Sequence, residues 1–175
     1  MNRIMKATLI VTILLLIGYY FFIKEEKLYG NDPQSIIKVI QSIDSYTQSE
    51  IVILEIKDID EHRIVSFLAN NKPAFISFTQ NEKGNYLWNY ARSENGEPFS
   101  MFLPSPGRDI KKILFVTSNE SKLSKIAVDI NGIPIEQSFT PFQASVSWVD
   151  LPESAEGSYQ YRNYRYYDEH GQLME

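Results

Sequence analysis

The sequence predicts an α+β protein: an N-terminal transmembrane helix, then one amphipathic helix and an antiparallel β-sheet meander or sandwich-like domain. Three observations predict this class. Residues 7–23 carry no charge, apolar residues between 36 and 46 recur at helical spacing, and from residue 50 onward the apolar pattern alternates with a period of two. The chain has 175 residues, 43% of them hydrophobic, which is enough for one ordinary folded domain.

The first predicted element is a membrane anchor. Residues 7–23 are 17 uncharged positions, enough for a helix about 25 Å long, near the lower limit for crossing a bilayer. Arg3 and Lys6 precede this run while the four charges after it cancel, which places the N-terminus in the cytoplasm. No pair of small residues follows where a signal peptidase would cut. We therefore expect an uncleaved signal anchor in the lipid bilayer of the cell membrane, with residues 1–27 as cytoplasmic tail and single-pass anchor and residues 28–175 as an exported, extracytoplasmic α+β domain.

Charge and cysteine content exclude several functions. Residues 28–175 contain 13 Lys and Arg against 20 Asp and Glu, a net charge of −7. Such a surface repels nucleic acid, so no nucleic-acid partner is expected. The absence of cysteine excludes a disulfide framework, a thiol nucleophile and thiolate zinc sites.

An amphipathic helix is predicted to open the exported domain. Asp32 is a favourable N-cap, and Pro33 fits the first position of a helix. Apolar residues then recur at steps of three and four, through about Tyr46: Ile36, Val39, Ile40 and Ile43. This stripe predicts a helix packed on a sheet, and the scarcity of basic residues on its polar face disfavours a membrane-surface helix.

Alternating apolar runs separated by turn residues predict a succession of antiparallel strands after residue 50. The runs are 51–57, 63–69, 74–80, 86–92, 112–117, 125–130, 133–139 and 145–149, with a last strand expected within 159–167. Asn131-Gly132 is the sharpest hairpin signal. The stretch 98–109 holds three prolines and breaks the pattern, so it is either a boundary between two halves of the sheet system or a functional loop.

The side chains within these strands are assigned to faces by alternation. A period of two puts Tyr86, Trp88 and Tyr90 on one face of their strand. Trp88 and Phe115 are expected in the hydrophobic core.

No local motif for catalysis, metal binding or a cofactor is present. His62 follows three carboxylates within 58–61, but the spacing fits neither a calcium loop nor a helical zinc site. His170 precedes Gly171 in what the composition indicates is a turn. The sequence contains no nucleophile elbow, phosphate-binding loop or dinucleotide fingerprint. We therefore predict a protein that is not an enzyme and that has no catalytic residues, no metal and no cofactor.

The most unusual segment is 159–167, which holds five tyrosines and two arginines in nine residues. Both residue types combine a flat apolar face with hydrogen-bonding ends. One interpretation is a binding strip for a protein, a peptide or a wall glycan, and the other is a final strand whose tyrosines pack on the core. Burial of the rings of both Tyr164 and Tyr166 would exclude the strip. The candidate binding residues are Tyr159, Tyr161, Arg162, Tyr164, Arg165 and Tyr166.

The order of segments along the chain is similar to that of a known group of proteins. A short anchor and a helix are followed by Tyr86-Leu87-Trp88 and then by the segments 113–118 (ILFVTS), 126–132 (IAVDING) and 166–173 (YYDEHGQL). This arrangement resembles uncharacterised, single-pass membrane-anchored extracytoplasmic proteins of Gram-positive bacteria. The resemblance spans most of the chain and implies a location and a fold, but it implies no activity.

These observations predict a membrane-anchored extracytoplasmic domain that acts as a non-enzymatic binding or accessory module. Its expected partners are the bilayer, through residues 7–23, and an extracytoplasmic protein, peptide or glycan. One alternative is an extracytoplasmic hydrolase of wall polymer or peptide, using carboxylates that the fold brings together. Two carboxyl groups converging in a cleft with raised pKa values would favour it. A further alternative is a small membrane-protein regulator that acts through its transmembrane helix.

Overall fold

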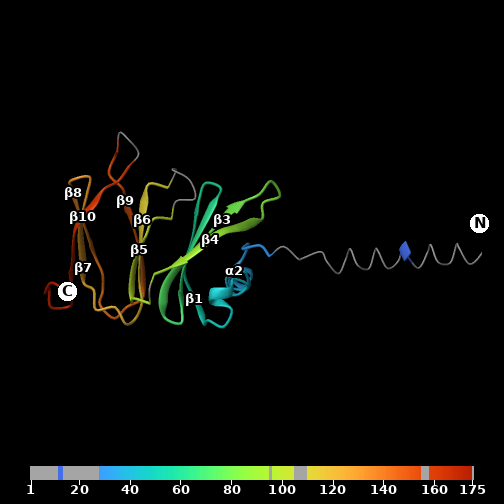
Figure 1. The fold of residues 1–175 in the computed structure, drawn as a ribbon, viewed down its shortest axis with the longest axis horizontal. Helices are drawn as coiled ribbons and strands as arrows, with labels where there is room; N and C mark the ends of the chain where they lie inside the picture. Colours follow the sequence, from blue (N-terminus) through green and yellow to red (C-terminus); the bar gives the residue numbers. More distant parts are fainter. Residues whose placement is uncertain (1–11, 14–27, 95, 105–109, 155–157, 175) are drawn as a thin grey trace, which may run out of the picture.

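The computed structural model describes residues 12–13, 28–94, 96–104, 110–154 and 158–174. Four layers follow one another in this part of the chain, namely a short helix and then a first, a middle and a third antiparallel sheet (Figure 1). The helix covers the outer face of the first sheet, and the middle sheet lies between the other two. Three separate hydrophobic clusters fill the three interfaces between the layers.

The predicted amphipathic helix is confirmed as α2 (Pro33–Gln41), and a single 3-10 turn, η1 (Asp44–Tyr46), follows it. The Asp32 carboxylate accepts hydrogen bonds from the backbone N–H groups of Gln34 and Ser35, both at 3.0 Å. Hydrogen bonds from Ser35 lower the pKa of this carboxyl group. Three apolar residues of α2 are fully buried against the first sheet: Ile36, Val39 and Ile40.

The first sheet is a meander of four consecutive strands in the order β1-β2-β3-β4. Its strands are β1 (Ile51–Ile59), β2 (His62–Ala69), β3 (Lys72–Gln80) and β4 (Tyr86–Ser93). Alternate residues of β2 face opposite sides of the sheet. Val65 and Phe67 pack against α2, whereas Ile64 and Leu68 pack against the middle sheet. Both faces are therefore buried, and six consecutive residues of β2, from Ile64 to Ala69, are buried.

The middle and third sheets exchange strands along the chain. The middle sheet contains β5 (Phe99–Phe102), β6 (Lys112–Thr117) and β9 (Ser145–Asp150), in the order β5-β6-β9. The third sheet contains β7 (Lys125–Ile130), β8 (Ile133–Ser138) and β10 (Tyr161–Tyr167), in the order β10-β7-β8. The β7–β8 hairpin thus lies in sequence between two strands of the middle sheet. Its turn is Asn131-Gly132, as predicted, with φ values of 52° and 79°.

Strand β6 forms the centre of the molecule. Leu114 and Val116 face the first sheet, while Ile113 and Phe115 face the third sheet, and all four side chains are fully buried. The Phe115 ring stacks on Phe99 with the centroids 6.0 Å apart and meets Phe139 edge-on at 5.8 Å. A strand covered on both faces explains why residues 113–116 form a continuous apolar run.

Three strands contain a β-bulge, which resets the alternation of side chains. The pairing register shifts between Ile53 and Glu55 in β1, at Asn89 in β4 and between Arg162 and Arg165 in β10. In β4 the bulge places Tyr86 on the side of α2 and turns Tyr90 toward the middle sheet.

The shared face predicted for the aromatic residues of β4 is therefore wrong. Tyr86 and Tyr90 contact different cores, because the bulge at Asn89 inserts one extra residue between them. Trp88, which was also predicted in the core, is 43% exposed. Phe115, in contrast, is fully buried as predicted.

Arg63 connects the segment before α2 to the first sheet. Its guanidinium group donates two hydrogen bonds of 2.7 Å to the two carboxylate oxygens of Asp58. It also donates to the carbonyl oxygens of Gly30 at 2.9 Å and Asn31 at 3.0 Å. The group lies 3.9 Å from the ring centroid of Tyr86. One side chain thus joins three parts of the chain.

This cluster predicts a pH dependence of stability. The hydrogen bonds from Arg63 hold the pKa of Asp58 below its ordinary value of 3.8. A carboxyl group with a lowered pKa in the folded state stabilises the fold above its unfolded pKa, and the contribution is lost as the pH falls through the folded pKa. We expect the urea concentration at the unfolding midpoint to decrease when the pH is lowered below about 4. This decrease should be smaller in the Asp58→Asn variant. Urea midpoints are measured at several pH values for both proteins. An equal dependence of the midpoint on pH in the two proteins would contradict this role.

The predicted fold class is wrong. About 50% of the described residues are in strands and 10% are in helices, so the fold is a β-rich stack of antiparallel sheets and not an α+β domain behind a transmembrane helix. One helix on one outer face leaves the sheets to supply most of the core.

The predicted membrane location is also corrected. Within the described residues, no helix combines the length and the apolar character needed to cross a bilayer. This finding contradicts the single-pass membrane protein with a cytoplasmic N-terminus, a signal anchor and an extracytoplasmic domain. The predicted span, residues 7–23, lies outside the described residues except for residues 12–13.

Candidate binding groove

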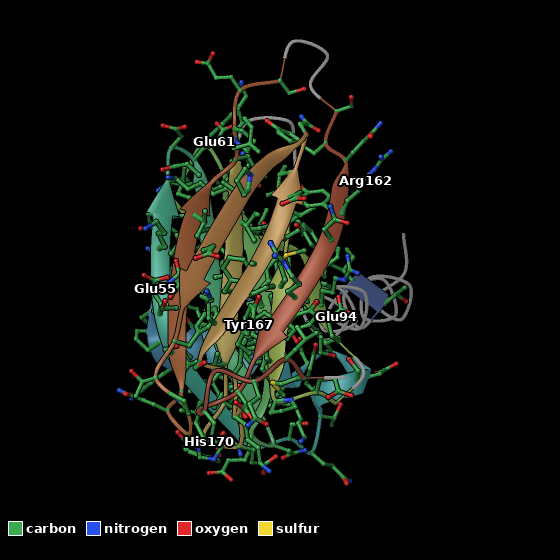
Figure 2. All side chains as sticks on the ribbon, turned by 90° about the vertical axis from the view of Figure 1, so that its left-hand side faces the viewer. Glu55, Glu61, Glu94, Arg162, Tyr167 and His170 are labelled. Atoms are coloured by element: carbon green, nitrogen blue, oxygen red, sulfur yellow. The ribbon has the colours of Figure 1, made fainter. Side chains whose placement is uncertain are left out.

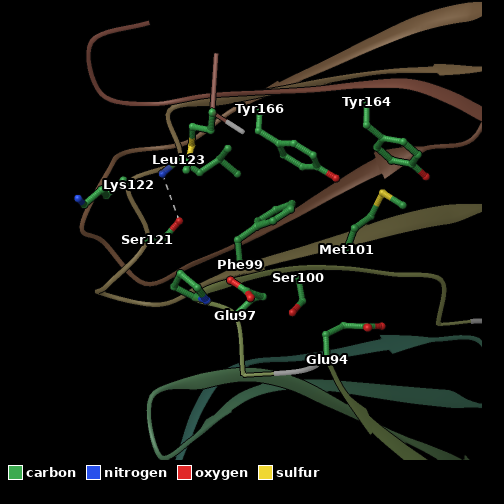
Figure 3. A pocket seen from close by; sticks show the side chains of 12 residues that line it. Glu94, Glu97, Phe99, Ser100, Met101, Ser121, Lys122, Leu123, Tyr164 and Tyr166 are labelled. Carbon is green, nitrogen blue, oxygen red and sulfur yellow. Dashed lines mark hydrogen bonds between the residues drawn. The ribbon is translucent and has the colours of Figure 1, made fainter. Parts of the chain in front are cut away.

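A groove of about 470 Å³ lies between β5, at the edge of the middle sheet, and β10, at the edge of the third sheet (Figure 3). Figure 2 looks onto the third sheet and shows Glu94 on the same side of the molecule as Arg162 of β10. Apolar and aromatic side chains supply much of the lining: Pro98, Phe99, Met101, Leu123, Tyr164, Tyr166 and Met174. The polar lining residues are Glu94, Glu97, Ser100, Ser121 and Lys122.

The bulge in β10 builds the tyrosine wall of the groove. Asn163 adopts a left-handed φ of 54°, and its side-chain amide donates a 2.6 Å hydrogen bond to the carboxylate of Asp129. The extra residue at the bulge resets the alternation, so that Tyr164 and Tyr166 lie on the side of β10 that faces β5. Their rings are nearly parallel, at 8°, with the centroids 6.3 Å apart. Burial is the main cause of a raised pKa for both phenols.

Strand β5 supplies the opposite wall. Phe99 and Met101 point toward the third sheet, and the Phe99 ring lies 6.1 Å from the ring of Tyr166. At one end the wall continues into Leu123, which is buried, and Met174. Met174 is held there because its backbone N–H donates to the carbonyl oxygen of Tyr166 at 2.8 Å.

Charged side chains lie at different ends of the groove. Glu94 and Glu97 come from the connection between β4 and β5, and Lys122 lies at the far end from Glu94 (Figure 3). The Glu94 carboxylate forms an ion pair of 2.9 Å with Arg92. Glu97 is exposed. Arg92 offsets the charge of Glu94, so Glu97 supplies most of the net negative charge in the lining, which favours positively charged groups.

Ser100 is a buried hydroxyl in the lining of the groove. It is 3% exposed, and its hydroxyl group has no hydrogen-bond partner among the described residues. Ser66 and Ser77 are fully buried and equally unpartnered, and they lie on the face of the first sheet that meets the middle sheet. Ser100 alternates with Phe99 and Met101 in β5, so its side chain points toward the first sheet and away from β10. Its enclosed hydroxyl group is therefore not a contact for a ligand in the groove.

The structure divides the candidate binding residues into three groups. Tyr164, which is 40% exposed, and the half-buried Tyr166 line the groove. Arg162 and Arg165 are exposed and do not line it. Because the rings of Tyr164 and Tyr166 are not both buried, the condition that would exclude a binding strip is not met. Binding by these residues stays a prediction.

Tyr159 and Tyr161 form the third group. Both are half-buried and pack on the core between the middle and third sheets. Their hydroxyl groups are enclosed and have no hydrogen-bond partner among the described residues. Burial, with smaller contributions from Tyr164 and Tyr159, raises the pKa of Tyr161 to about 12. These two side chains therefore follow the alternative interpretation, in which the tyrosines pack on the core.

Neither histidine takes part in the groove. The Nδ1 atom of His62 lies 3.2 Å from the hydroxyl group of Thr79 in the first sheet. His170 is exposed and lies 3.9 Å from the carboxylate of Glu169. In the described part of the chain, no group of three histidine, cysteine or acidic residues is placed to hold a metal ion.

Four groove residues carry no clear signal in the sequence. Phe99 and Met101 belong to β5, a strand of four residues inside the stretch 98–109 that breaks the apolar pattern. Glu94 and Glu97 lie in the connection just before it. The change from the first to the middle sheet falls just before this stretch, between Ser93 and Phe99, and the stretch itself holds β5 and its connection to β6 in the same sheet. Residues 105–109 of the stretch lie outside the described residues.

No family model matches the chain, and no curated protein or solved structure matches it. The fold and the groove thus define a β-rich protein of three stacked sheets with one candidate site at the strand edges. The resemblance to membrane-anchored proteins of Gram-positive bacteria stays a prediction, and the function has to be inferred from the groove.

Proposed function

We propose that this protein is a non-enzymatic binding module whose ligand lies in the groove between β5 and β10. The parallel rings of Tyr164 and Tyr166 in the wall of this groove are the observation that carries the proposal. Tyrosines combine a large apolar contact area with a polar hydroxyl group and lose little conformational entropy on binding. Apolar walls with a few polar groups are also typical of binding sites.

The hydrolase alternative receives less support from the same groove. Glu94 and Glu97 both line it, but Glu94 is held in an ion pair with Arg92 and Glu97 is exposed. A general acid needs an apolar enclosure that keeps its carboxyl group protonated near neutral pH. Neither Glu94 nor Glu97 has such an enclosure. The regulator alternative depends on residues 7–23, which lie outside the described residues apart from residues 12–13.

Tyr164→Ala is expected to weaken ligand binding about tenfold, because loss of an aromatic contact costs about 1–1.5 kcal/mol. Binding would be measured by saturation-transfer NMR on the full chain in mild detergent. The probes are a randomised mixture of linear peptides and a set of cell-wall oligosaccharides. Tyr164 is well exposed, so this substitution should leave the fold intact.

Arg165→Ala is the matched control for this experiment. Arg165 is exposed and lies between the two groove tyrosines in the sequence, but it does not line the groove. We expect its substitution to change binding by less than about twofold. The proposed function would be wrong if neither probe set binds, or if Tyr164→Ala binds as well as the unaltered protein.

A further inference from the structure

Among the residues that the structure describes, nothing pairs with the outer edge of β5. In the middle sheet β5 pairs only with β6. The backbone N–H of Ser118 donates to the carbonyl oxygen of Pro98 at 2.8 Å, and Phe99 lies opposite Thr117. In an antiparallel ladder, hydrogen-bonded and non-hydrogen-bonded pairs alternate. Phe99 therefore belongs to a non-hydrogen-bonded pair, and Ser100 belongs to a hydrogen-bonded one.

This register turns specific backbone groups outward. The N–H and C=O groups of Ser100 and Phe102 point to β6, whereas those of Phe99 and Met101 point to the free edge. In the described part of the chain, no hydrogen bond occupies these outward groups. Phe99 and Met101 also line the groove, which therefore runs along this edge.

The neighbouring strand edges are protected, in contrast to β5. The edge of β10 is covered by the C-terminal segment, through the bridge between Tyr167 and Leu173 and the hydrogen bond from Met174. The edge strand β4 is interrupted by its bulge at Asn89. Bulges and covering segments are the usual means by which proteins protect strand edges from other chains. An unprotected edge beside a groove is consistent with a functional use.

Two further features of the groove favour a peptide with a basic side chain. Glu94 and Glu97 present carboxylates at its edge, and residues 28–175 carry a net charge of −7. Tyr164 and Tyr166 can receive the apolar stem or the cationic head of Lys or Arg on their rings.

We propose that the ligand is an extended peptide segment of a partner protein, which adds as a strand to the free edge of β5 and directs a Lys or Arg side chain toward Glu94 and Glu97. This inference rests on the proposed function and specifies its ligand. The peptide backbone pairs with the outward groups of Phe99 and Met101, which provides affinity. Alternate side chains enter the groove and provide selectivity.

The first test is a selection of linear peptides from a displayed random library against the immobilised full-length chain. We expect the selected sequences to contain Lys or Arg flanked by apolar residues. The best peptide is then synthesised in two forms, with N-methyl groups on one or the other set of alternate amides. Methylation of the set that faces β5 should weaken binding at least about tenfold, and methylation of the other set by less than about threefold.

Variants of the protein provide an independent readout. Met101→Pro removes one outward N–H and no bond to β6, a position that tolerates proline on an edge strand. Met101→Leu keeps the N–H and the apolar side chain. We expect the first variant to weaken peptide binding about tenfold and the second by less than about threefold. If Met101→Pro does not fold, the N-methylated peptides still test whether the ligand backbone pairs with β5. Glu97→Gln should reduce the preference for basic peptides.

The outcomes separate this inference from the proposed function. Peptides that need Tyr164 but bind equally well with either set of amides methylated would overturn strand addition and leave the binding module in place. If no peptide is selected but oligosaccharides bind through Tyr164, strand addition by a peptide would again be overturned and the binding module would stand. Binding that does not depend on Tyr164 would overturn both. A dimer in light scattering that Met101→Pro abolishes would identify a second copy of this chain as the occupant and overturn the peptide partner.

Discussion

Replacement of Phe115 by alanine is expected to lower the free energy of unfolding by about 3–5 kcal/mol. The ring is fully buried at the centre of the middle sheet and packs against Phe99 and Phe139. Its removal loses the transfer free energy of the ring and leaves a cavity that sheets fixed on both sides cannot easily close. Urea denaturation followed by circular dichroism measures the loss.

Trp88→Ala is the comparison for this prediction. Trp88 is also a large aromatic residue in a strand, but it is 43% exposed. We expect its substitution to cost about 1 kcal/mol, well below the loss at Phe115. A loss below about 1 kcal/mol for Phe115→Ala would contradict the burial of β6 between two sheets.

The second large effect is expected for Arg63→Ala, which should lower the free energy of unfolding by about 2–3 kcal/mol. The substitution removes two hydrogen bonds to Asp58 and leaves the carbonyl oxygens of Gly30 and Asn31 without this donor. It also removes the contact with the ring of Tyr86. The loss is measured by urea denaturation. Hydrogen exchange would show increased opening of the segment before α2.

Arg92→Ala is the control for this variant. Arg92 also forms an ion pair with a carboxylate, that of Glu94, but its side chain is 62% exposed, compared with 13% for Arg63. Exposed ion pairs contribute at most about 1 kcal/mol. Equal losses for the two variants would show that the contacts of Arg63 with Gly30, Asn31 and Tyr86 add nothing to the ion pair.

The sequence predicted most of the elements because their signals are local. The N-cap at Asp32 and the apolar stripe of α2 lie within a few turns of one helix, and Asn131-Gly132 marks a hairpin by itself. The predicted strand runs match the observed strands closely, except for β5. Its four residues are too few for a visible alternation, and prolines flank them. The fold class was wrong because, in the described part of the chain, α2 contributes only a single outer layer beside ten strands.

The faces of the strands could not be predicted in the same way. A bulge changes which side chains share a face, but its sequence signal is weak. At Asn163 the left-handed backbone is stabilised by a hydrogen bond to Asp129, which lies 34 residues away in the sequence. The segment 159–167 was recognised as unusual, yet only the bulge decides that Tyr164 and Tyr166 face the groove.

The groove itself has no local sequence signature. Its lining comes from the connection before β5, from β5, from residues 121–123, from β10 and from Met174. These segments meet only because the middle and third sheets stack with β5 and β10 at neighbouring edges. Residue spacing along the chain carries no information about such a meeting, so Glu94 and Glu97 could not be assigned from the sequence.

The exchange of strands between the middle and third sheets has a consequence for biosynthesis. The first sheet is complete at Ser93, whereas β9 ends at Asp150 and β10 ends at Tyr167. The face of β6 that meets the third sheet, and the edge of β6 that pairs with β9, therefore stay incompletely covered until most of the chain has left the ribosome. Nascent chains that pause before β9 expose one apolar face and one unpaired edge of β6, and such species bind chaperones or aggregate. Efficient production of this protein thus depends on how quickly its last quarter is translated.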